Sequence, residues 1–109
     1  MYLVCLITAS TPDEASRIAR ALVEERLAAC VNVVPGIRSV YRWREAIEEA
    51  DELLLVAKTT AASFERLRER VLALHSYEVP EIVALPIESG HPDYLMWMAE
   101  SVGGSAAGR

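Results

Sequence analysis

Residues 2–27, YLVCLITASTPDEASRIARALVEERL, contain the first strand and the first helix of the chain, and they set the pattern for the rest. The run 2–9 is apolar and rich in residues that favour β-strands. Thr11 can cap a helix, Pro12 suits its first turn, and Glu14 completes a capping box. The apolar residues that follow at helical spacing are Ala15, Ile18, Ala19, Leu22, Val23 and Leu27. A buried strand followed by an amphipathic helix of about four turns is therefore predicted.

The next residues form one interrupted strand, after which strand-like and helix-like segments alternate. Residues 30–43, CVNVVPGIRSVYRW, look extended, and Pro35 and Gly36 within them predict a bend or bulge. We expect the acidic segment 44–52 to turn the chain over. The segments that follow are a buried strand at 53–59, a helix in 63–75, a strand in 78–88 and a short helix in 91–102.

This order of elements predicts an α+β fold. The order β-α-β-β-α-β with an added C-terminal helix matches the split βαβ, or ferredoxin-like, arrangement, in which two helices cover one face of an antiparallel sheet. We expect residues 1–102 to form a single domain of this kind, since no repeat and no linker interrupts them. Residues 103–109 are small and polar, and we expect a flexible tail there.

The composition is that of a folded protein and disfavours several classes of partner. Of the 109 residues, 52% are hydrophobic and 25% are charged, and the net charge is −5. An acidic chain without a basic patch is a poor partner for nucleic acid and for anionic membranes. No apolar stretch reaches the roughly 20 residues of a transmembrane helix, and the N-terminus has no basic leader. Cys5 and Cys30 lie in apolar surroundings without a CxxC motif, so we expect free thiols in the cytoplasm.

Three of the strands are too apolar for a sheet that has one face in water. Such a sheet alternates apolar and polar residues, but 2–7, 53–57 and 82–87 do not alternate. Two helices cover one face, and the short last helix covers only part of the other. A monomer would then expose on the order of several hundred Å² of contiguous apolar surface, which is unusual. We therefore predict an oligomer whose sheets pack inward.

Six motifs occur along the chain in a set order: LITAS followed by DEA, LVEERLAACVNVVPG, SVYRW, KTT, LHSYEVPEIVALPI and DYLMW. With these motifs the chain resembles the CutA-type divalent-cation tolerance proteins over residues 2–100. The resemblance implies a ferredoxin-like subunit, a cytoplasmic homotrimer, and long second and third strands that reach neighbouring subunits. It also implies a link to copper and other divalent cations, so metal ions are expected partners while no cofactor is obligatory.

The copper site that the resemblance implies is incomplete in this sequence. Its three proposed ligands are a cysteine on the first strand and two adjacent histidines, of which His75 matches the second. Leu74 replaces the first histidine, and Ile7 occupies the cysteine position, two residues after Cys5. Imidazole and thiolate suit copper, although a histidine at a helix end and apolar cysteines also have ordinary structural roles. The candidate ligands of Cu(II) or another divalent cation are His75, Cys5, Cys30 and Glu81.

Three further residues are candidates for a ligand cleft. Trp43 either lines the cleft or has the ordinary role of a tryptophan in a core or an interface. Tyr77 either donates a hydrogen bond into a cleft or covers the helix–strand junction. Lys58 lies inside an apolar strand, so its ammonium must reach water, find a carboxylate or face a cavity. The acids of 45–52 are expected at a solvated hairpin tip. There Glu45 stands where the family often has glycine, and a turn of different shape is expected, because a left-handed Glu45 would cost about 1–2 kcal/mol.

Two functions remain open at this point. The first is a non-enzymatic trimer of metal homeostasis that binds divalent cations modestly, which His75 and the acids favour. The alternative is a PII-like signalling trimer that binds a small anionic ligand in intersubunit clefts, which Lys58 and the arginines favour, although it rests on fold analogy. No HExxH, GxGxxG, P-loop or GxSxG motif supports an enzyme.

Overall fold

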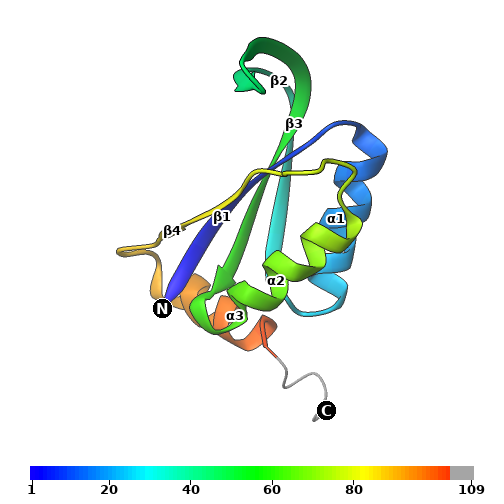
Figure 1. Cartoon of the computed structure of the whole chain (residues 1–109). Coiled ribbons are helices and arrows are strands. Elements are labelled where there is room, and N and C mark those ends of the chain that lie inside the picture. Colours follow the sequence, from blue (N-terminus) through cyan, green and yellow to red (C-terminus); the bar gives the residue numbers. More distant parts are fainter. Residues whose placement is uncertain (104–109) are drawn as a thin grey trace.

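The computed structural model describes residues 1–103 and confirms the ferredoxin-like α+β fold (Figure 1). Its four strands form one antiparallel sheet in the order β2-β3-β1-β4. The elements in chain order are β1 (Tyr2–Ala9), α1 (Pro12–Glu24), β2 (Cys30–Trp43), β3 (Ala46–Thr60), α2 (Ala61–Leu74), β4 (Ile82–Pro86) and α3 (Pro92–Ser101). No helix within residues 1–103 is long and apolar enough to cross a membrane.

The first helix begins where the sequence predicted it. The Thr11 hydroxyl accepts a hydrogen bond from the Glu14 amide, and Pro12 occupies the first turn. The Glu14 carboxylate reaches back to the backbone amide and hydroxyl of Ser10, at 2.9 and 2.8 Å, one residue earlier than a standard capping box. The helix ends at Glu24, which makes it slightly shorter than the four turns expected.

Helices α1 and α2 cover one face of the sheet, which we call the covered face. Its β1 residues are Cys5, Ile7 and Ala9, and Leu55 and Ala57 of β3 lie beside them in the register. These side chains pack against apolar residues of both helices in a single cluster with almost no exposed surface. Burial of this kind is the main favourable term in folding.

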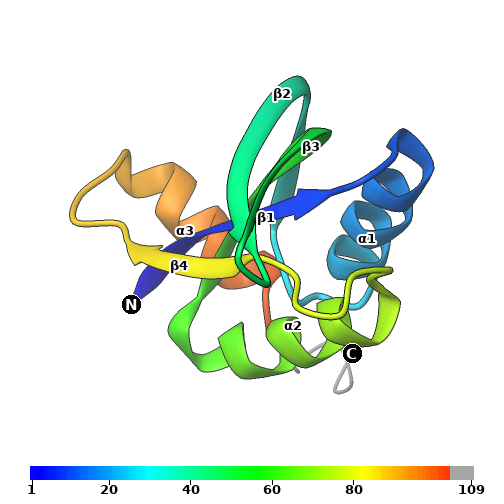
Figure 2. The ribbon, with the colours of Figure 1, turned by 45° about the horizontal axis from the view of Figure 1, so that its top comes forward.

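The opposite face of the sheet, which we call the open face, is covered only in part. Its residues pair across the strands in the register and include Val4, Leu6, Val34, Leu54, Val56, Val83 and Leu85. Helix α3 lies on this side (Figure 2) and buries Met98 and Val102 against Ala29 and Tyr2 near the start of β1. Val34, Val83 and Leu85 remain 40, 47 and 53% exposed. The predicted excess of apolar sheet surface is therefore present in the single chain.

Strands β2 and β3 extend beyond the rest of the sheet as a two-stranded arm, residues 37–52 (Figure 1). The predicted bulge is confirmed: the β2–β3 register shifts between Val34 and Ile37, and Gly36 has φ +77°. The expectation that 44–52 is a turn was wrong, because β3 already begins at Ala46. In paired strands the backbone N–H and C=O groups form hydrogen bonds with each other. An acidic segment can therefore be a strand of the arm, where its side chains need not enter a core.

The arm ends in a tight turn whose shape was also predicted wrongly. Arg44 and Glu45 both have positive φ, 51° and 70°, between the paired residues Trp43 and Ala46. Two successive positive φ values are what a two-residue type I′ hairpin requires, and that turn matches the twist of paired strands. The long strand pairing therefore outweighs the local strain at Glu45. The predicted tail 103–109 lies outside the described residues except for Gly103, whose amide donates to the Arg26 carbonyl at 2.9 Å.

Candidate functional site

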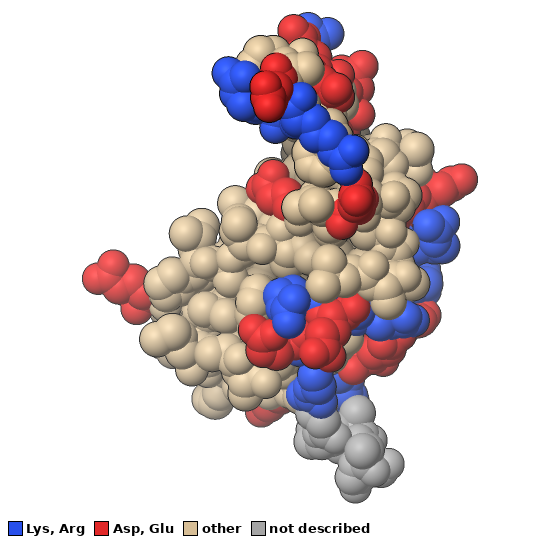
Figure 3. Space-filling model, in the orientation of Figure 1, with Lys and Arg blue, Asp and Glu red and all other residues tan. Residues whose placement is uncertain are grey.

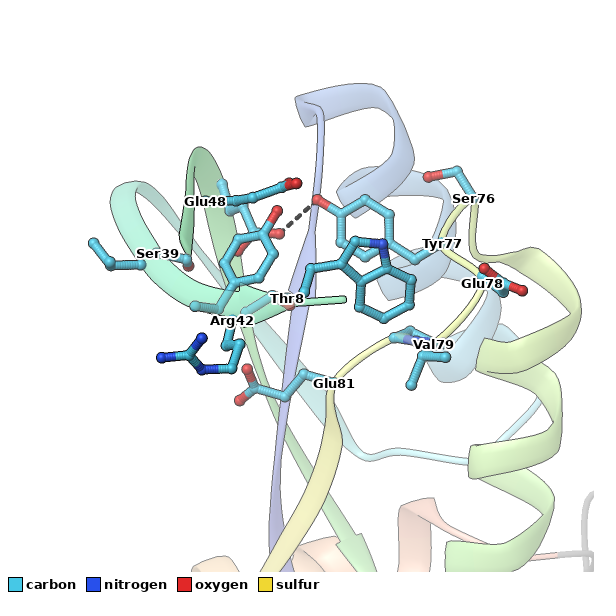
Figure 4. A pocket seen from close by; sticks show the side chains of 14 residues that line it. Thr8, Ser39, Arg42, Glu48, Ser76, Tyr77, Glu78, Val79 and Glu81 are labelled. Carbon is cyan, nitrogen blue, oxygen red and sulfur yellow. Dashed lines mark hydrogen bonds between the residues drawn. The ribbon is translucent and has the colours of Figure 1, made fainter. Parts of the chain in front are cut away.

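A cavity of about 860 Å³ lies where the arm meets the segment between α2 and β4. Figure 4 shows Glu48 entering it from the arm and Glu81 from the segment that leads into β4. The lining residues are Thr8 of β1, Ser39, Val40, Tyr41, Arg42, Trp43, Glu48 and Glu52 of the arm, and Ser76, Tyr77, Glu78, Val79, Pro80 and Glu81. Four carboxylates, three aromatic rings and one guanidinium thus surround the space.

The deepest polar contact of this cavity joins Tyr77 to Glu52. The Tyr77 hydroxyl donates to Oε2 of Glu52 at 2.5 Å, which links the segment after α2 to the base of the arm (Figure 4). Glu52 is only 6% exposed, so the expectation that it belongs to a solvated hairpin tip was wrong. Burial, and then the hydrogen bond to the Glu52 carboxylate, raise the pKa of Tyr77 well above its usual range. The phenol therefore stays protonated and donates.

The side chain of His75 is fully buried, and it contacts Thr8 and Tyr77 of the cavity wall. Its Nε2–H donates to the Thr8 carbonyl oxygen at 2.6 Å, and its Nδ1 accepts from the Tyr77 backbone amide at 3.1 Å. Because an amide can only donate, Nδ1 carries the lone pair and the ring is the neutral Nε2–H tautomer. Both ring nitrogens are thus occupied by the protein in this conformation, and the imidazole fixes the segment that carries Tyr77.

Glu14 holds the same junction from the helix side. Its carboxylate accepts from the backbone amide of Ser76 at 2.7 Å, in addition to the two bonds from Ser10. Its Oε2 lies 3.7 Å from Nδ1 of His75. Burial alone raises the pKa of this carboxyl, but the hydrogen bonds from Ser10 and Ser76 outweigh it and lower the pKa to about 2. The charged Glu14 carboxylate is therefore buried at low cost, because both of its oxygens accept hydrogen bonds, Oε1 from Ser10 and Oε2 from Ser76.

The tip of the arm is attached to the other wall of the cavity. Nη2 of Arg44 lies 2.8 Å from the Glu78 carboxylate, and the Arg44 guanidinium also stacks 4.9 Å from the ring centroid of Trp43. Both partners of the ion pair are exposed, so it contributes at most about 1 kcal/mol. The ion pair joins the tip of the arm to the segment between α2 and β4.

The four candidate metal ligands lie in different places. Cys5 points into the covered face, and its burial raises the pKa of the thiol to about 11, which keeps it protonated at neutral pH. Cys30 pairs with Lys58 in the register and therefore faces the open side of the sheet. His75 lies in the junction, and Glu81 lines the cavity. Among residues 1–103, no three His, Cys, Asp or Glu side chains converge to hold a metal ion.

Of the candidate cleft residues, Trp43 and Tyr77 line the cavity and Lys58 does not. The Lys58 ammonium instead donates to the Asn32 side-chain oxygen on the open face. The most deeply buried carboxylate of the cavity, Glu52, was not singled out by the sequence. Its position could have been predicted from its spacing to Leu54. The two residues are two apart on the same strand, so their side chains lie on one face of the sheet.

The chain matches the family model described as CutA1 divalent ion tolerance protein over residues 3–101. It is 58% identical to the divalent-cation tolerance protein CutA of Thermus thermophilus, across 92% of this chain and 97% of that protein. The solved structure of the Thermus thermophilus protein superimposes with a TM-score of 0.93 over 94% of this chain and all of that chain, at 57% identity. The structure of a protein from Archaeoglobus fulgidus, described as a periplasmic divalent cation tolerance protein CutA, superimposes with a TM-score of 0.91 at 44% identity, over 94% of this chain and 100% of that one. The chain spans 52 to 65% of the length of the similar animal and plant proteins.

Proposed function

The chain belongs to the CutA1 divalent ion tolerance family, and from this premise we propose that it acts in the homeostasis of copper and other divalent cations, as a cytoplasmic homotrimer that binds such ions modestly and catalyses no reaction. The observation that carries the proposal is the family match across residues 3–101, together with the names of the relatives. The Archaeoglobus fulgidus protein is described as periplasmic, so the compartment is part of the proposal.

The open face of the sheet supports the assembly. Val34, Val83 and Leu85 lie on it with 40 to 53% of their surface exposed, and Met96 and Trp97 of the neighbouring α3 are exposed as well. In Figure 3 the surface around β4 carries few charged side chains, whereas acidic and basic residues gather on the arm. A contiguous apolar surface of this kind marks an interaction site. Three copies that pack these faces together would remove it from water.

The acidic lining of the cavity supports attraction of cations. Glu48, Glu52, Glu78 and Glu81 face a single guanidinium, that of Arg42, among the lining residues. Carboxylates concentrated around a partly enclosed space raise the local concentration of cations. Lys58, which favoured the alternative of a small anionic ligand, lies outside this cavity, on the open face against Asn32.

Copper binding by His75 requires the imidazole ring to break one of its two hydrogen bonds. A metal bound at Nδ1 would replace the Tyr77 amide, and one bound at Nε2 would replace the Thr8 carbonyl. Such an exchange costs part of the binding free energy, which accounts for modest affinity. The softer ligands in the chain are the two cysteines, of which only Cys30 is accessible to solvent.

Copper titration of matched variants tests the proposal. We expect His75→Ala to weaken Cu(II) binding about tenfold or more, equivalent to roughly 1.4 kcal/mol, whereas His91→Ala should change nothing because His91 is an exposed residue before α3. Since His75 is buried, Glu81→Gln serves as a second variant that leaves the junction intact. Light scattering should give three subunit masses for each protein. Copper titrations that superimpose for the parent and both variants would exclude this site.

A further inference from the structure

The cavity between the arm and the segment 76–81 is larger than a site for a bare metal ion, and its lining combines carboxylates with aromatic rings. It encloses about 860 Å³, and its carboxylates are spread around the wall. Within residues 1–103 they do not converge into a set of three metal-binding groups. A hard divalent ion requires several oxygen ligands at about 2.0–2.6 Å, so this wall is poorly arranged for one. Carboxylates set apart across a large space suit a polyatomic cation whose charges are themselves set apart.

The Glu52 carboxylate lines the cavity, and the described part of the chain supplies a hydrogen-bond donor to only one of its two oxygens. The side chain is 6% exposed, and only its Oε2 has a donor, the Tyr77 hydroxyl. No donor within residues 1–103 reaches Oε1, yet no fully buried side-chain oxygen there lacks a partner, so Oε1 opens into the cavity. A desolvated carboxylate oxygen binds a cationic N–H donor more strongly than an exposed one does.

Aromatic rings complete the surroundings that an organic cation prefers. Tyr41 and Trp43 line the cavity from the arm and Tyr77 lines it from the opposite segment. The Trp43 ring already attracts one guanidinium, that of Arg44. Faces of aromatic rings attract ammonium and guanidinium groups and accommodate the methylene chain between them. An anion would meet four carboxylates and a single guanidinium, that of Arg42. An apolar ligand would leave Glu52 buried without its second partner.

We propose that this cavity binds a small aliphatic organic cation with two ammonium or guanidinium groups, one on Glu52 and the other on Glu48 or Glu81 across the cavity. Glu48 and Glu81 enter from facing sides (Figure 4) and form no ion pair within the described part of the chain. This proposal does not rest on the proposed metal function, although Glu81 is a candidate group in both. Thr8 and Glu52 share the sheet face of Leu54, so the cavity opens on the side where copies of the chain would meet.

Calorimetric titration of the assembled protein with putrescine and agmatine tests this proposal. Both should bind and raise Tm, whereas 1,4-butanediol, which has the length of putrescine without its charge, should not bind. Magnesium chloride at matched ionic strength controls for general screening of the acidic arm. Binding of the diol as strongly as the diamine, or an equal Tm shift with magnesium, would overturn the proposal.

Variants locate the site. Glu52→Gln, which can still accept from Tyr77, should weaken diamine binding about tenfold, and Glu81→Gln about threefold. Glu49→Gln is the matched control, since Glu49 lies on the same arm outside the cavity and near Arg38. Equal affinities for all three variants, or no amine binding to the parent because a second copy fills the space, would refute the site.

Discussion

The two faces of the β-sheet are built from similar apolar residues but have different surroundings. On the covered face, Ile7 and Leu55 are completely buried beneath α1 and α2. On the open face, Val83 and Leu85 remain about half exposed, although they lie on strands of the same sheet. An apolar strand sequence alone therefore does not tell whether its own chain buries a given side chain.

The largest effect is expected from a charge on the open face. In the proposed trimer, Leu85→Glu would bury a carboxylate at the interface of each copy, at several kcal/mol per ion and on the order of 10 kcal/mol per trimer. We expect light scattering to give a monomer mass for this variant. Leu72→Glu is the control, because Leu72 is 44% exposed on the outer side of α2. A trimer of unchanged stability in Leu85→Glu would show that the open face is not the interface.

The covered face should respond to truncation without a change of assembly. Leu55→Ala would leave a cavity in the core cluster that also contains its register partner Ile7, and we expect unfolding to become easier by about 2–5 kcal/mol. Denaturant unfolding at fixed protein concentration measures it. Leu72→Ala should stay within about 0.5 kcal/mol of the parent. A comparable loss in both variants would mean that the two positions do not differ in packing.

Glu14 carries a buried charge whose hydrogen-bond donors all come from its own chain, unlike the apolar residues of the open face, which their own chain leaves exposed. Its pKa is lowered from 4.5 to about 2, so the folded state gains stability above pH 4.5 and loses it as the pH falls from there towards 2. The shift corresponds to about 3 kcal/mol. Glu14→Gln should therefore be less stable at pH 7 by about 2–3 kcal/mol and should lack this loss on acidification. Parallel stability curves for parent and variant between pH 2 and 5 would contradict the assignment.

The smallest effect is expected at the tip of the arm. Glu45 has φ +70°, so Glu45→Gly should relieve strain and stabilise the fold by about 1 kcal/mol. Arg44→Gly relieves strain at the same turn but removes the contacts with Glu78 and Trp43, so its gain should be smaller. Denaturant midpoints compare the two variants. A destabilised Glu45→Gly protein would indicate that the turn does not require left-handed residues.

Local rules in the sequence were sufficient for the element order. The Thr11 cap, the bulge at Gly36 and the alternation of strands and helices act over a few residues, so they could be read from spacing. Trp43 and Tyr77 were expected in a cleft and line the cavity. The family resemblance implied a long third strand, but the residue pattern alone missed the length of β3, because the acidic segment resembles a loop until its pairing with β2 supplies hydrogen bonds.

The sequence by itself determined the fold class and the excess of apolar strand surface, since both follow from hydrophobic period and local turn chemistry. Only the tertiary structure decided which carboxylates are buried and what each one contacts. Glu14 and Glu52 look like their exposed neighbours in the sequence, yet one accepts bonds from Ser10 and Ser76 and the other from Tyr77. Ser76 and Tyr77 lie 62 and 25 residues along the chain from the carboxylates that they bind, and the cost of burying a charge depends on such partners as well as on nearby residues.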